Sequence, residues 1–600
     1  MNLKYCWTAD FETTTDENDC RVWAYSVCNI EDPSQFYYGN SMEGFFDFIS
    51  QLPKNNRVWF HNLKFDGVYL LNYLLTHSYE WVSTADERAT KTFRTLITDR
   101  GQFYSIIVYF TVKDKKTHKV EFFDSLKIFP NFSVERVAEG FNLPIRKLSI
   151  DYRKTRRVNH KLTTEEIDYI RNDVEIIARA LNIMFNQGLN KMTIASDAMN
   201  NFKEHFIGFR KKFPLLPSDL DTELRKSYRG GFTYVNEVWQ NKITPPGVVL
   251  DVNSLYPSTM VQCDQPYGKP VYYEGEYKYD ATHPLFIQCI SCYFTLKPGK
   301  IPCVQLRNNL SFIPNEYVKS SKGKLVTLYL TKPDYELFRE QYDTYNLKHL
   351  YGWKFKSSTG LFDSYINYWT EQKIKAGKEK NAPLRQISKL MLNSIYGRFA
   401  LSANARQKAP YLDEEGVVRF MLLPPETRET VYLPVASFIT AYGRNKTIRT
   451  SQAIRDFTLK KYGEDRYFYS DTDSVHAALT NEDLEELKDI IKIDDYELGY
   501  WAKEAEFTRG LYIRQKCYIE EIDGEVHVTV AGLPKYLAPL ITFDNFKKGF
   551  TTEGLNVRDM IRLAKKNGAS PEVLEKIQHK LTYKYVKGGV ILADTDFTIK

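Results

Sequence analysis

The segment Tyr469-Ser470-Asp471-Thr472-Asp473-Ser474 constrains this 600-residue chain more than any other. It follows an aromatic run and precedes a valine, a pattern that predicts two strands joined by a tight turn that carries two carboxylates. Burying unpaired carboxylates is costly, so such a turn does not serve a core. A third acid, Asp251, ends the apolar run 248–250 far upstream. Carboxylates that converge from two strands are what a two-metal phosphoryl-transfer site needs, with ions about 3.5–4 Å apart.

Four further acids come from the ends of two predicted strands and from one helix: Asp10, Glu12, Asp66 and Asp173. The first strand is predicted over residues 5–13, and its alternation places Asp10 and Glu12 on one face. A helix is predicted to begin near Thr163, with Glu166 completing a capping box. Tyr169 lies four residues before the helical acid and therefore beside it. An Asp-x-Glu pair alone also fits a solvated strand end, so the hypothesis of a second metal site depends on the whole set.

Length and composition predict several domains of a globular chain, with 43% hydrophobic and 26% charged residues. No run reaches the roughly 18 apolar residues of a membrane span, and the N-terminus lacks the apolar core of a signal peptide, so we expect a cytoplasmic protein. The net charge of +7 is mild for this length. Aromatic residues, at 14%, suit stacking on unpaired bases or simply fill an aromatic-rich core. The pair Cys289 and Cys292 lies within a strand pattern, which argues against a metal or redox site.

Five segments, in this order, resemble the polymerase motifs of family-B DNA polymerases: Tyr228-Arg229-Gly230-Gly231, residues 251–258, residues 389–397, residues 471–473 and Lys516-Cys517-Tyr518. Upstream of them, residues 10–13, residues 62–66 and the Tyr169-x-x-x-Asp173 spacing resemble the three motifs of DnaQ-like 3′–5′ exonucleases. The resemblance implies a multidomain α/β and α+β fold. An RNase H-like exonuclease domain would precede a right-hand polymerase with palm, fingers and thumb.

Two inserts and the C-terminal ending resemble the protein-primed subgroup found in phi-twenty-nine-type tailed bacteriophages. The first insert is predicted to be rich in strands over residues 274–356, and the second, residues 402–433, to form a hairpin-like excursion. Helical patterning covers residues 362–399 between them, and two further helices are predicted over 557–566 and 571–580 before a final strand near 589–592. The chain carries residues beyond the subgroup's pattern around 551–575. The implied domains are the exonuclease 1–193, palm 194–263 and 435–540, insert one 264–357, fingers 358–400, insert two 401–434 and thumb 541–600.

The resemblance also implies roles for individual residues. In the exonuclease, Tyr169 would orient the attacking water, and Lys147 would neutralise the scissile phosphate, although a solvated lysine there would be unremarkable. The implied metal ligands are Asp251, Val252 and Asp473, with Asp471 as a supporting acid, and Asp10, Glu12, Asp66 and Asp173. The implied nucleotide-binding residues are Tyr256, Lys373, Lys389, Asn393 and Tyr396. The implied DNA-binding residues are Thr13, His61, Asn62, Phe65, Ser125, Leu126, Tyr228, Gly230, Gly231, Lys516 and Tyr518.

Within this set, Lys389, Asn393 and Tyr396 fall on one helix face, where a lysine can reach a triphosphate. Tyr256 would exclude ribonucleotides. A short insertion separates Lys373 from Lys389 relative to the family.

The function implied is a processive, strand-displacing replicative DNA polymerase with 3′–5′ proofreading and two-metal chemistry at both sites. Carboxylate oxygens and phosphates suit Mg²⁺, two ions per site, with Mn²⁺ as a substitute. The implied partners are template and primer DNA, single-stranded DNA, deoxynucleoside triphosphates and a terminal protein that supplies the priming hydroxyl in a heterodimer. The implied location is the cytoplasm of an infected bacterium. The alternatives are the same enzyme from a linear plasmid or transposon, a nuclease whose polymerase half is structural, and a non-catalytic DNA-binding factor.

Overall fold

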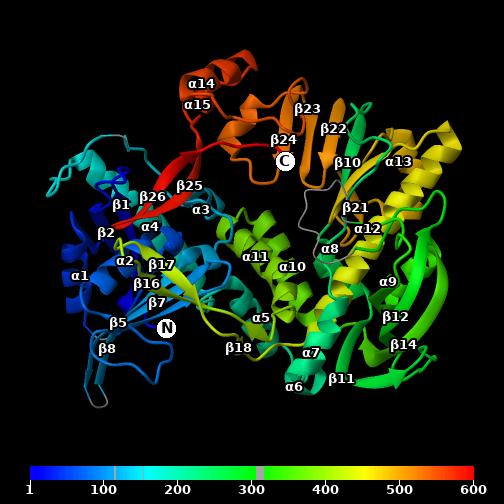
Figure 1. Cartoon of the computed structure of the whole chain (residues 1–600), viewed down its shortest axis with the longest axis horizontal. Helices are drawn as coiled ribbons and strands as arrows, with labels where there is room; N and C mark the ends of the chain where they lie inside the picture. The colour runs from blue at the N-terminus through cyan, green and yellow to red at the C-terminus, as the bar shows by residue number, and fades with distance from the viewer. Residues whose placement is uncertain (54, 114–115, 153, 306–316) are drawn as a thin grey trace.

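The computed structural model describes residues 1–53, 55–113, 116–152, 154–305 and 317–600. Figure 1 shows the N-terminal sheet at one end of the molecule and a four-stranded sheet at the other, with helices α10 and α11 between them. Residues 306–316, part of the block predicted to be rich in strands, lie outside the described residues. No helix in the described part of the chain is both long and apolar enough to cross a membrane.

The N-terminal unit is a sheet of eight strands in the order β3-β2-β1-β4-β8-β7-β6-β5. Its strands are β1 Cys6–Thr13, β2 Val22–Asn29, β3 Phe36–Gly39, β4 Asn56–Phe60, β5 Glu80–Trp81, β6 Thr92–Ile97, β7 Phe103–Lys113 and β8 Lys116–Asp124. Its helices are α1 Met42–Gln51, α2 Leu63–Thr76, α3 Val134–Gly140 and α4 Thr164–Asn186. The capping box predicted for α4 is confirmed, because the Thr163 side chain accepts from the Glu166 backbone and the Glu166 side chain accepts from the Thr163 backbone.

The two faces of β1 are buried by different helices. Trp7, Ala9 and Phe11 belong to one apolar core together with α1 and α2. Cys6 belongs to another core with α3 and α4, and the Thr8 hydroxyl donates to the Val174 carbonyl of α4 at 2.8 Å. Because side chains alternate along a strand, Asp10 and Glu12 share one face, as the sequence predicted, and this face lies toward α4.

The central sheet has the order β21-β10-β20-β19-β9 and brings the two predicted acidic segments together. Its strands are β9 Thr233–Val235, β10 Gly247–Val252, β19 Tyr467–Asp471, β20 Ser474–Ala477 and β21 Trp501–Phe507. The helices α8 Leu255–Gln262, α12 Leu433–Tyr462 and α13 Asn481–Leu487 accompany it. The predicted strand, turn and strand around Asp471 and Asp473 are confirmed, since β19 and β20 pair antiparallel. β20 also pairs with β10, with Asp251 opposite Ser474.

Two further units flank this sheet. A four-stranded sheet contains β11 Gln265–Glu274, β12 Leu285–Leu296, β13 Val326–Thr331 and β14 Tyr342–Ser358, packed with α9 Lys332–Gln341. The predicted helical region forms α10 Asp363–Lys378 and α11 Ala382–Phe399, which pack near α5 Ile194–Glu204. The short helices α6 Phe209–Lys212 and α7 Ser218–Leu224 complete this region.

The predicted excursion, residues 402–433, is confirmed as two small antiparallel ladders. The inner one pairs β15 Asn404–Ala405 with β18 Glu426–Thr427, and the outer one pairs β16 Lys408–Leu412 with β17 Val418–Leu422. Phe420 of β17 packs against Phe103 of the N-terminal sheet and against Tyr585 near the C-terminus, each with ring centroids 5.7 Å apart. The excursion therefore contacts two parts of the chain that are distant in sequence.

The C-terminal region contains a three-stranded sheet, two helices and a final hairpin. These elements are β22 Arg509–Arg514, β23 Cys517–Ile522, β24 Glu525–Val530, α14 Val557–Lys566, α15 Pro571–Leu574, β25 Lys580–Val586 and β26 Gly589–Thr595. The helix predicted over 557–566 is confirmed. The one predicted over 571–580 is wrong beyond Leu574, because the chain turns there and Lys580 begins a strand. The hairpin of β25 and β26 packs against α2, and this tertiary contact is not visible in the helical periodicity of residues 571–580.

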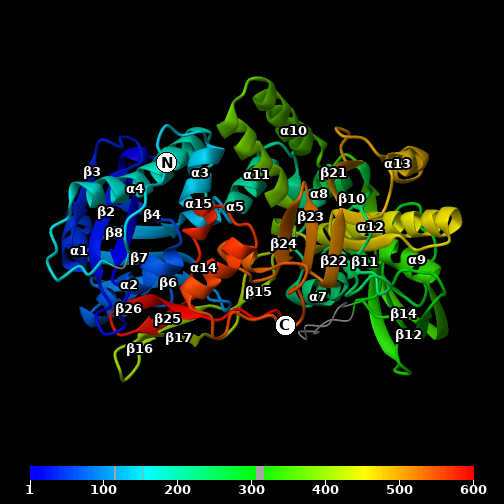
Figure 2. The ribbon, with the colours of Figure 1, turned by 90° about the horizontal axis from the view of Figure 1, so that it is seen from above.

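The final hairpin crosses back to the N-terminal sheet, as both Figure 1 and Figure 2 show. The Tyr69 hydroxyl of α2 donates to the Val590 carbonyl at 2.5 Å. Gly589 allows this approach, because a Cβ there would lie 2.3 Å from the Tyr69 ring. The two ends of the chain are thereby joined beside the first group of acids.

Candidate active sites

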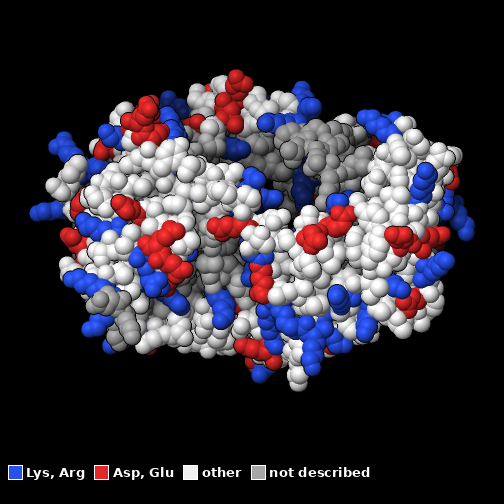
Figure 3. All heavy atoms as spheres, turned by 60° about the horizontal axis from the view of Figure 1, so that its bottom comes forward, with Lys and Arg blue, Asp and Glu red and all other residues white. Residues whose placement is uncertain are grey.

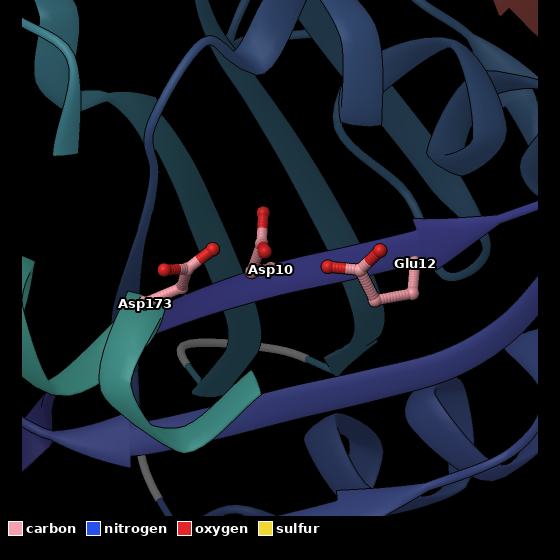
Figure 4. Close-up of side chains that lie close together, drawn as sticks. All are labelled: Asp10, Glu12 and Asp173. Carbon is pink, nitrogen blue, oxygen red and sulfur yellow. The ribbon is translucent and has the colours of Figure 1, made fainter. Parts of the chain in front are cut away.

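Three of the four N-terminal acids converge in space. Asp10 and Glu12 project from β1 and Asp173 projects from α4, and Figure 4 shows their carboxylates pointing toward one another. One ligand atom from each lies within 4.8 Å of the other two. Glu12 and Asp173 are buried, with 6% and 5% exposure. Alternation along β1 places Asp10 and Glu12 on one face, and α4 brings Asp173 to them. The convergence of these three acids that the sequence predicted is therefore confirmed.

Asp66 stands beside this trio on the first turn of α2. Its Oδ1 accepts from the Phe11 backbone N–H at 3.3 Å, which ties α2 to the strand that carries the other acids. The turn into α2 passes through Asn62 in a left-handed conformation, with φ 82°. Asp66 is only 3% exposed, and burial together with the Asp10 carboxylate raises its pKa well above the usual range.

The electrostatics of this site fit a divalent cation. Burial raises the pKa of Asp10 to about 7, and the Asp173 carboxylate adds to the rise. Burial and the neighbouring acids also raise the pKa of Glu12 well above its usual range. Asp173 Oδ1 is buried and has no hydrogen-bond partner among the described residues. Buried carboxylates without enough donors are stabilised when they share a hard cation.

Lys147 and Tyr169 lie at the edge of the trio, as their predicted roles require. Lys147 Nζ is 2.5 Å from Asp173 Oδ2 and 3.4 Å from the Tyr169 hydroxyl. Burial lowers the pKa of Lys147, but Asp173, Asp10 and Tyr152 together raise it overall. The Tyr152 hydroxyl lies 2.5 Å from that of Tyr169. No role was predicted for Tyr152 from the sequence.

A cavity of about 780 Å³ lies beside the acids, and most of the residues expected to hold a DNA 3′ end line it. Thr13, His61, Asn62 and Phe65 line it. Ser125 is fully buried behind the wall and bonds His61 Nδ1 at 2.8 Å, so it supports the histidine rather than lining the cavity. Leu126 follows it and does not line the cavity either.

The other wall of this cavity comes from the C-terminal hairpin, which sequence reasoning missed. Leu581, Tyr583 and Leu592 line it, and Asn62 Nδ2 donates to the Tyr583 hydroxyl at 2.8 Å. The Lys64 ammonium lies 5.2 Å from the centre of the Tyr583 ring. These partners are separated by more than 500 residues, so no local pattern could have revealed them.

The second group of acids lies at the edge of the central sheet. Asp251 is on β10, and Asp473 is on the turn between β19 and β20, with the Val252 N–H donating to the Asp473 carbonyl at 2.9 Å. Burial, Asp473 and Glu504 raise the pKa of Asp251 to about 7, and burial raises that of Asp473. Glu504 on β21 lines the same cavity of about 690 Å³ and was missed, because its strand shows no motif.

Asp471 is held differently from Asp473, which agrees with a supporting role. Lys516 Nζ lies 3.0 and 2.9 Å from its two carboxylate oxygens. The Thr233 hydroxyl donates to its Oδ1 at 3.1 Å. Within the described residues this second site does not bring three ligand atoms as close together as the first site does. Its donors are nevertheless carboxylate oxygens at the mouth of an open cavity, a set that fits a divalent cation shared with a substrate phosphate.

The helix face predicted to bind nucleotide borders this site. Lys389 and Asn393 are exposed on α11, and the Tyr396 ring packs on Tyr256 with centroids 4.3 Å apart. Lys373 on α10 lies near Lys389 and Arg385. Burial, together with these two cations, lowers the pKa of Lys373. Arg385, one helix turn before Lys389, was missed although its spacing places it on the same face.

The two predicted DNA-contact motifs meet the acidic turn. A Cβ on Gly231 would lie 2.7 Å from the Thr472 side chain, so the glycine permits close packing against the turn. Gly230 has open space around its Cα, and Tyr228 packs at the edge of the core near Tyr396. Lys516 occupies a tight turn with φ 52°, and Tyr518 packs on Tyr469 at 4.8 Å.

Comparison with known proteins gives the class of this chain. The family model described as DNA polymerase type B, organellar and viral, matches residues 50–162 and 150–491. The chain is 40% identical to the DNA polymerase of Bacillus phage phi29 over 99% of both chains, and 32% identical to that of Streptococcus phage Cp-1 over 99% of this chain and 98% of the relative. It also matches the structure of phi29 DNA polymerase with primer-template DNA and incoming nucleotides, at TM-score 0.88 and 40% identity, covering 99% of this chain and 100% of that one.

The chain therefore belongs to the type B DNA polymerases of the organellar and viral family, and its fold is the mixed α/β multidomain fold of the phi29 enzyme. It is a DNA polymerase, and its family uses divalent metal ions. Another structure of the phi29 enzyme, with single-stranded DNA, matches at TM-score 0.87 and 39% identity over 99% of this chain.

Proposed function

We propose that this chain is a replicative, protein-primed DNA polymerase that displaces the non-template strand and proofreads with its own 3′–5′ exonuclease. The observation that carries the proposal is the presence of two separate carboxylate sites in one chain of a polymerase family. The residue ranges assigned are the exonuclease 1–193, palm 194–263 and 435–540, insert one 264–357, fingers 358–400, insert two 401–434 and thumb 541–600.

At the polymerase site, Asp251, Asp473 and the Val252 carbonyl hold the metal ions, which we assign as two Mg²⁺. When bound, the ions activate the primer hydroxyl and neutralise the triphosphate. Asp471 holds Lys516, whose turn with Tyr518 steadies the primer terminus. The template strand passes Tyr228, Gly230 and Gly231, where the backbone can approach closely.

The incoming nucleotide lies between α11 and the acids. Lys389 and Lys373 bind its triphosphate. The two cations lie near each other and repel, so a polyanion between them is favoured. Tyr396 and Asn393 face the nascent base pair. Tyr256, packed on Tyr396, fills the space that a ribose 2′-hydroxyl would need and so selects deoxynucleotides.

At the exonuclease site, Asp10, Glu12, Asp66 and Asp173 hold the second pair of ions. Tyr169 orients the attacking water and Lys147 neutralises the scissile phosphate. Lys147 contacts both the Asp173 carboxylate and the Tyr169 hydroxyl, so the two residues lie together beside the acids. Thr13, His61, Asn62 and Phe65 hold the single-stranded 3′ end, with Ser125 and Leu126 supporting that wall. A pocket of this volume accepts only a few nucleotides of an unpaired strand, which suits proofreading.

A direct test separates the two sites. Asp251→Ala or Asp473→Ala should abolish nucleotide incorporation while the purified protein still degrades single-stranded DNA. Asp10→Ala combined with Asp66→Ala should abolish degradation, raise misincorporation and keep polymerisation. Loss of an essential metal ligand should slow the affected reaction by several powers of ten. If either set of changes removes both activities from a folded protein, the assignment of separate sites is wrong.

Protein priming rests on the resemblance of both inserts and on the contacts of insert two. Phe420 of this insert touches the N-terminal sheet and the C-terminal hairpin, so these three parts can enclose DNA. Figure 3 shows basic side chains around the hollow between the two halves of the molecule, mixed with acidic ones. The test is a primer-free reaction with purified terminal protein, Mg²⁺ and one labelled nucleotide. Labelling of the terminal protein supports priming, and its absence with an active polymerase refutes it. The site of action assigned is the cytoplasm of an infected bacterium.

A further inference from the structure

A buried hydrogen-bonded pair crosses from the catalytic strand to the sheet that carries the primer-terminus turn. His476 Nδ1 on β20 lies 2.6 Å from Glu520 Oε1 on β23. Their side chains are only 2% and 5% exposed. β20 follows the turn that carries Asp473, whereas β23 follows the turn that carries Lys516. The pair therefore connects the central sheet to the three-stranded sheet, close to the turns that carry Asp473 and Lys516.

The surroundings of the pair leave its members little freedom. The Tyr512 hydroxyl donates to the same Glu520 oxygen at 2.6 Å, and His476 Nε2 lies 3.3 Å from the Ser474 hydroxyl. The Tyr469, Tyr512 and Tyr518 rings surround the imidazole, with centroids 5.2, 5.9 and 5.3 Å away. Both ends of the pair line the cavity that contains the acids. Such a buried polar network holds a single geometry, because breaking any one bond leaves a desolvated polar group.

We propose that His476 and Glu520 are positioning residues for the polymerase reaction, which fix the primer-terminus turn relative to the catalytic carboxylates. The inference rests on the proposed roles of Asp473 and Lys516. Direct in-line attack requires the reacting atoms to be about 3–3.5 Å apart, and a misplacement of 1 Å can cost about 100-fold in rate. The pair touches no reacting atom and acts only through the two turns it joins.

The experiment compares E520A and H476A with the conservative E520Q, which keeps an acceptor for Tyr512, and with the double variant H476F/E520L, which keeps the buried volume without charges. For E520A and H476A we expect the turnover number for incorporation to fall about 100-fold. The KM for the nucleotide and the degradation of single-stranded DNA should stay unchanged, and E520Q should recover most of the lost rate. H476F/E520L should fold and still incorporate slowly, because it lacks the directional link.

The readout that separates positioning from general stability is the combination with K516A. If the pair acts through the turn that carries Lys516, then E520A should add little to the defect of K516A. The inference would be overturned if the defects of E520A and K516A multiplied in the double variant. It would also be overturned if E520A lost incorporation and DNA degradation in parallel, or if its turnover number were unchanged. A K516A variant with wild-type incorporation would instead overturn the proposed role of Lys516, and with it this inference.

Discussion

The buried pair of Arg156 and Glu166 offers a quantitative test of how the exonuclease site is held together. Arg156 Nε lies 2.9 Å from Glu166 Oε1, and the two side chains are 3% and 4% exposed. The guanidinium also lies 4.0 Å from the centre of the Trp23 ring and donates to the Asp151 carbonyl at 3.0 Å. Arg156 therefore anchors the segment that brings Tyr152 and Lys147 to the catalytic acids.

Arg156→Met should destabilise this unit by about 3–5 kcal/mol, because removing one partner leaves a buried charge uncompensated. The lowered pKa of the Glu166 carboxylate gives a second measure of how strongly its buried partners stabilise this unit. Burial would raise its pKa, but hydrogen bonds from His160, from the Thr163 N–H and from Arg156 hold it at about 2. Against an ordinary value of 4.5, this shift corresponds to roughly 3 kcal/mol of stability at neutral pH.

The sign of the pH dependence follows from the lowered pKa. Stabilisation is fully present above the unfolded value and is lost as the pH falls from about 4.5 to 2. The difference in stability between wild type and Arg156→Met should therefore shrink across that range. Glu166→Gln, which can keep the capping box, should remove most of this dependence.

The assays are hydrogen exchange of the amides in β2 and α4, which reads local opening, and degradation of single-stranded DNA. Arg179→Met is the matched control, since Arg179 pairs with Glu175 on the same helix at 2.6 Å but is 40% exposed. That surface pair should contribute no more than about 1 kcal/mol. Exonuclease activity should fall only in Arg156→Met, with incorporation retained. Equal effects of the two substitutions, or a gap that persists unchanged at pH 2.5, would refute the reasoning.

Three further outcomes are expected for nucleotide addition. Tyr256→Ala should lower the preference for deoxynucleotides at least about tenfold, measured as the ratio of kcat/KM values. Lys389→Ala should raise the nucleotide KM about 10- to 100-fold through loss of a charged hydrogen bond, while Lys375→Ala on α10 serves as a surface control. Deletion of residues 402–433 should shorten products made in a single DNA encounter without slowing single-nucleotide insertion. Unchanged product length in a folded deletion variant would show that the excursion is no clamp.

Local patterns predicted part of the carboxylate sites, because strand or helix periodicity determines the positions of Asp10, Glu12 and Asp173. Asp10 and Glu12 share a strand face, and Tyr169 and Asp173 share a helix face, so two short-range rules placed four side chains. The capping box at Thr163 and the two strands around Asp471 follow from equally local chemistry.

Long-range pairing explains what the sequence could not predict. The strand from Lys580 forms a hairpin with β26 that packs back on α2, a contact that the local pattern of residues 571–580 does not show. Tyr583 reaches the exonuclease cavity, and Glu504 reaches the polymerase cavity, through strands that carry no motif of their own. His476 and Glu520 likewise meet only when two sheets pack together.

The two sites differ in their surroundings in a way that matches two different substrates. Three of the four exonuclease acids bring ligand atoms within 4.8 Å of one another, in a pocket whose outer wall is the C-terminal hairpin. An unpaired strand is narrow and flexible, so it can enter such a pocket and be gripped by Phe65 and its neighbours. The polymerase acids instead stand at the edge of a sheet beside exposed lysines, because a duplex end and a triphosphate together need open space. Since Asn62 bonds Tyr583 across the first pocket, a strand that enters must replace or share that bond. We therefore expect degradation to depend on the position of the C-terminal hairpin, and nucleotide addition to depend on the proposed link between the central sheet and the primer-terminus turn.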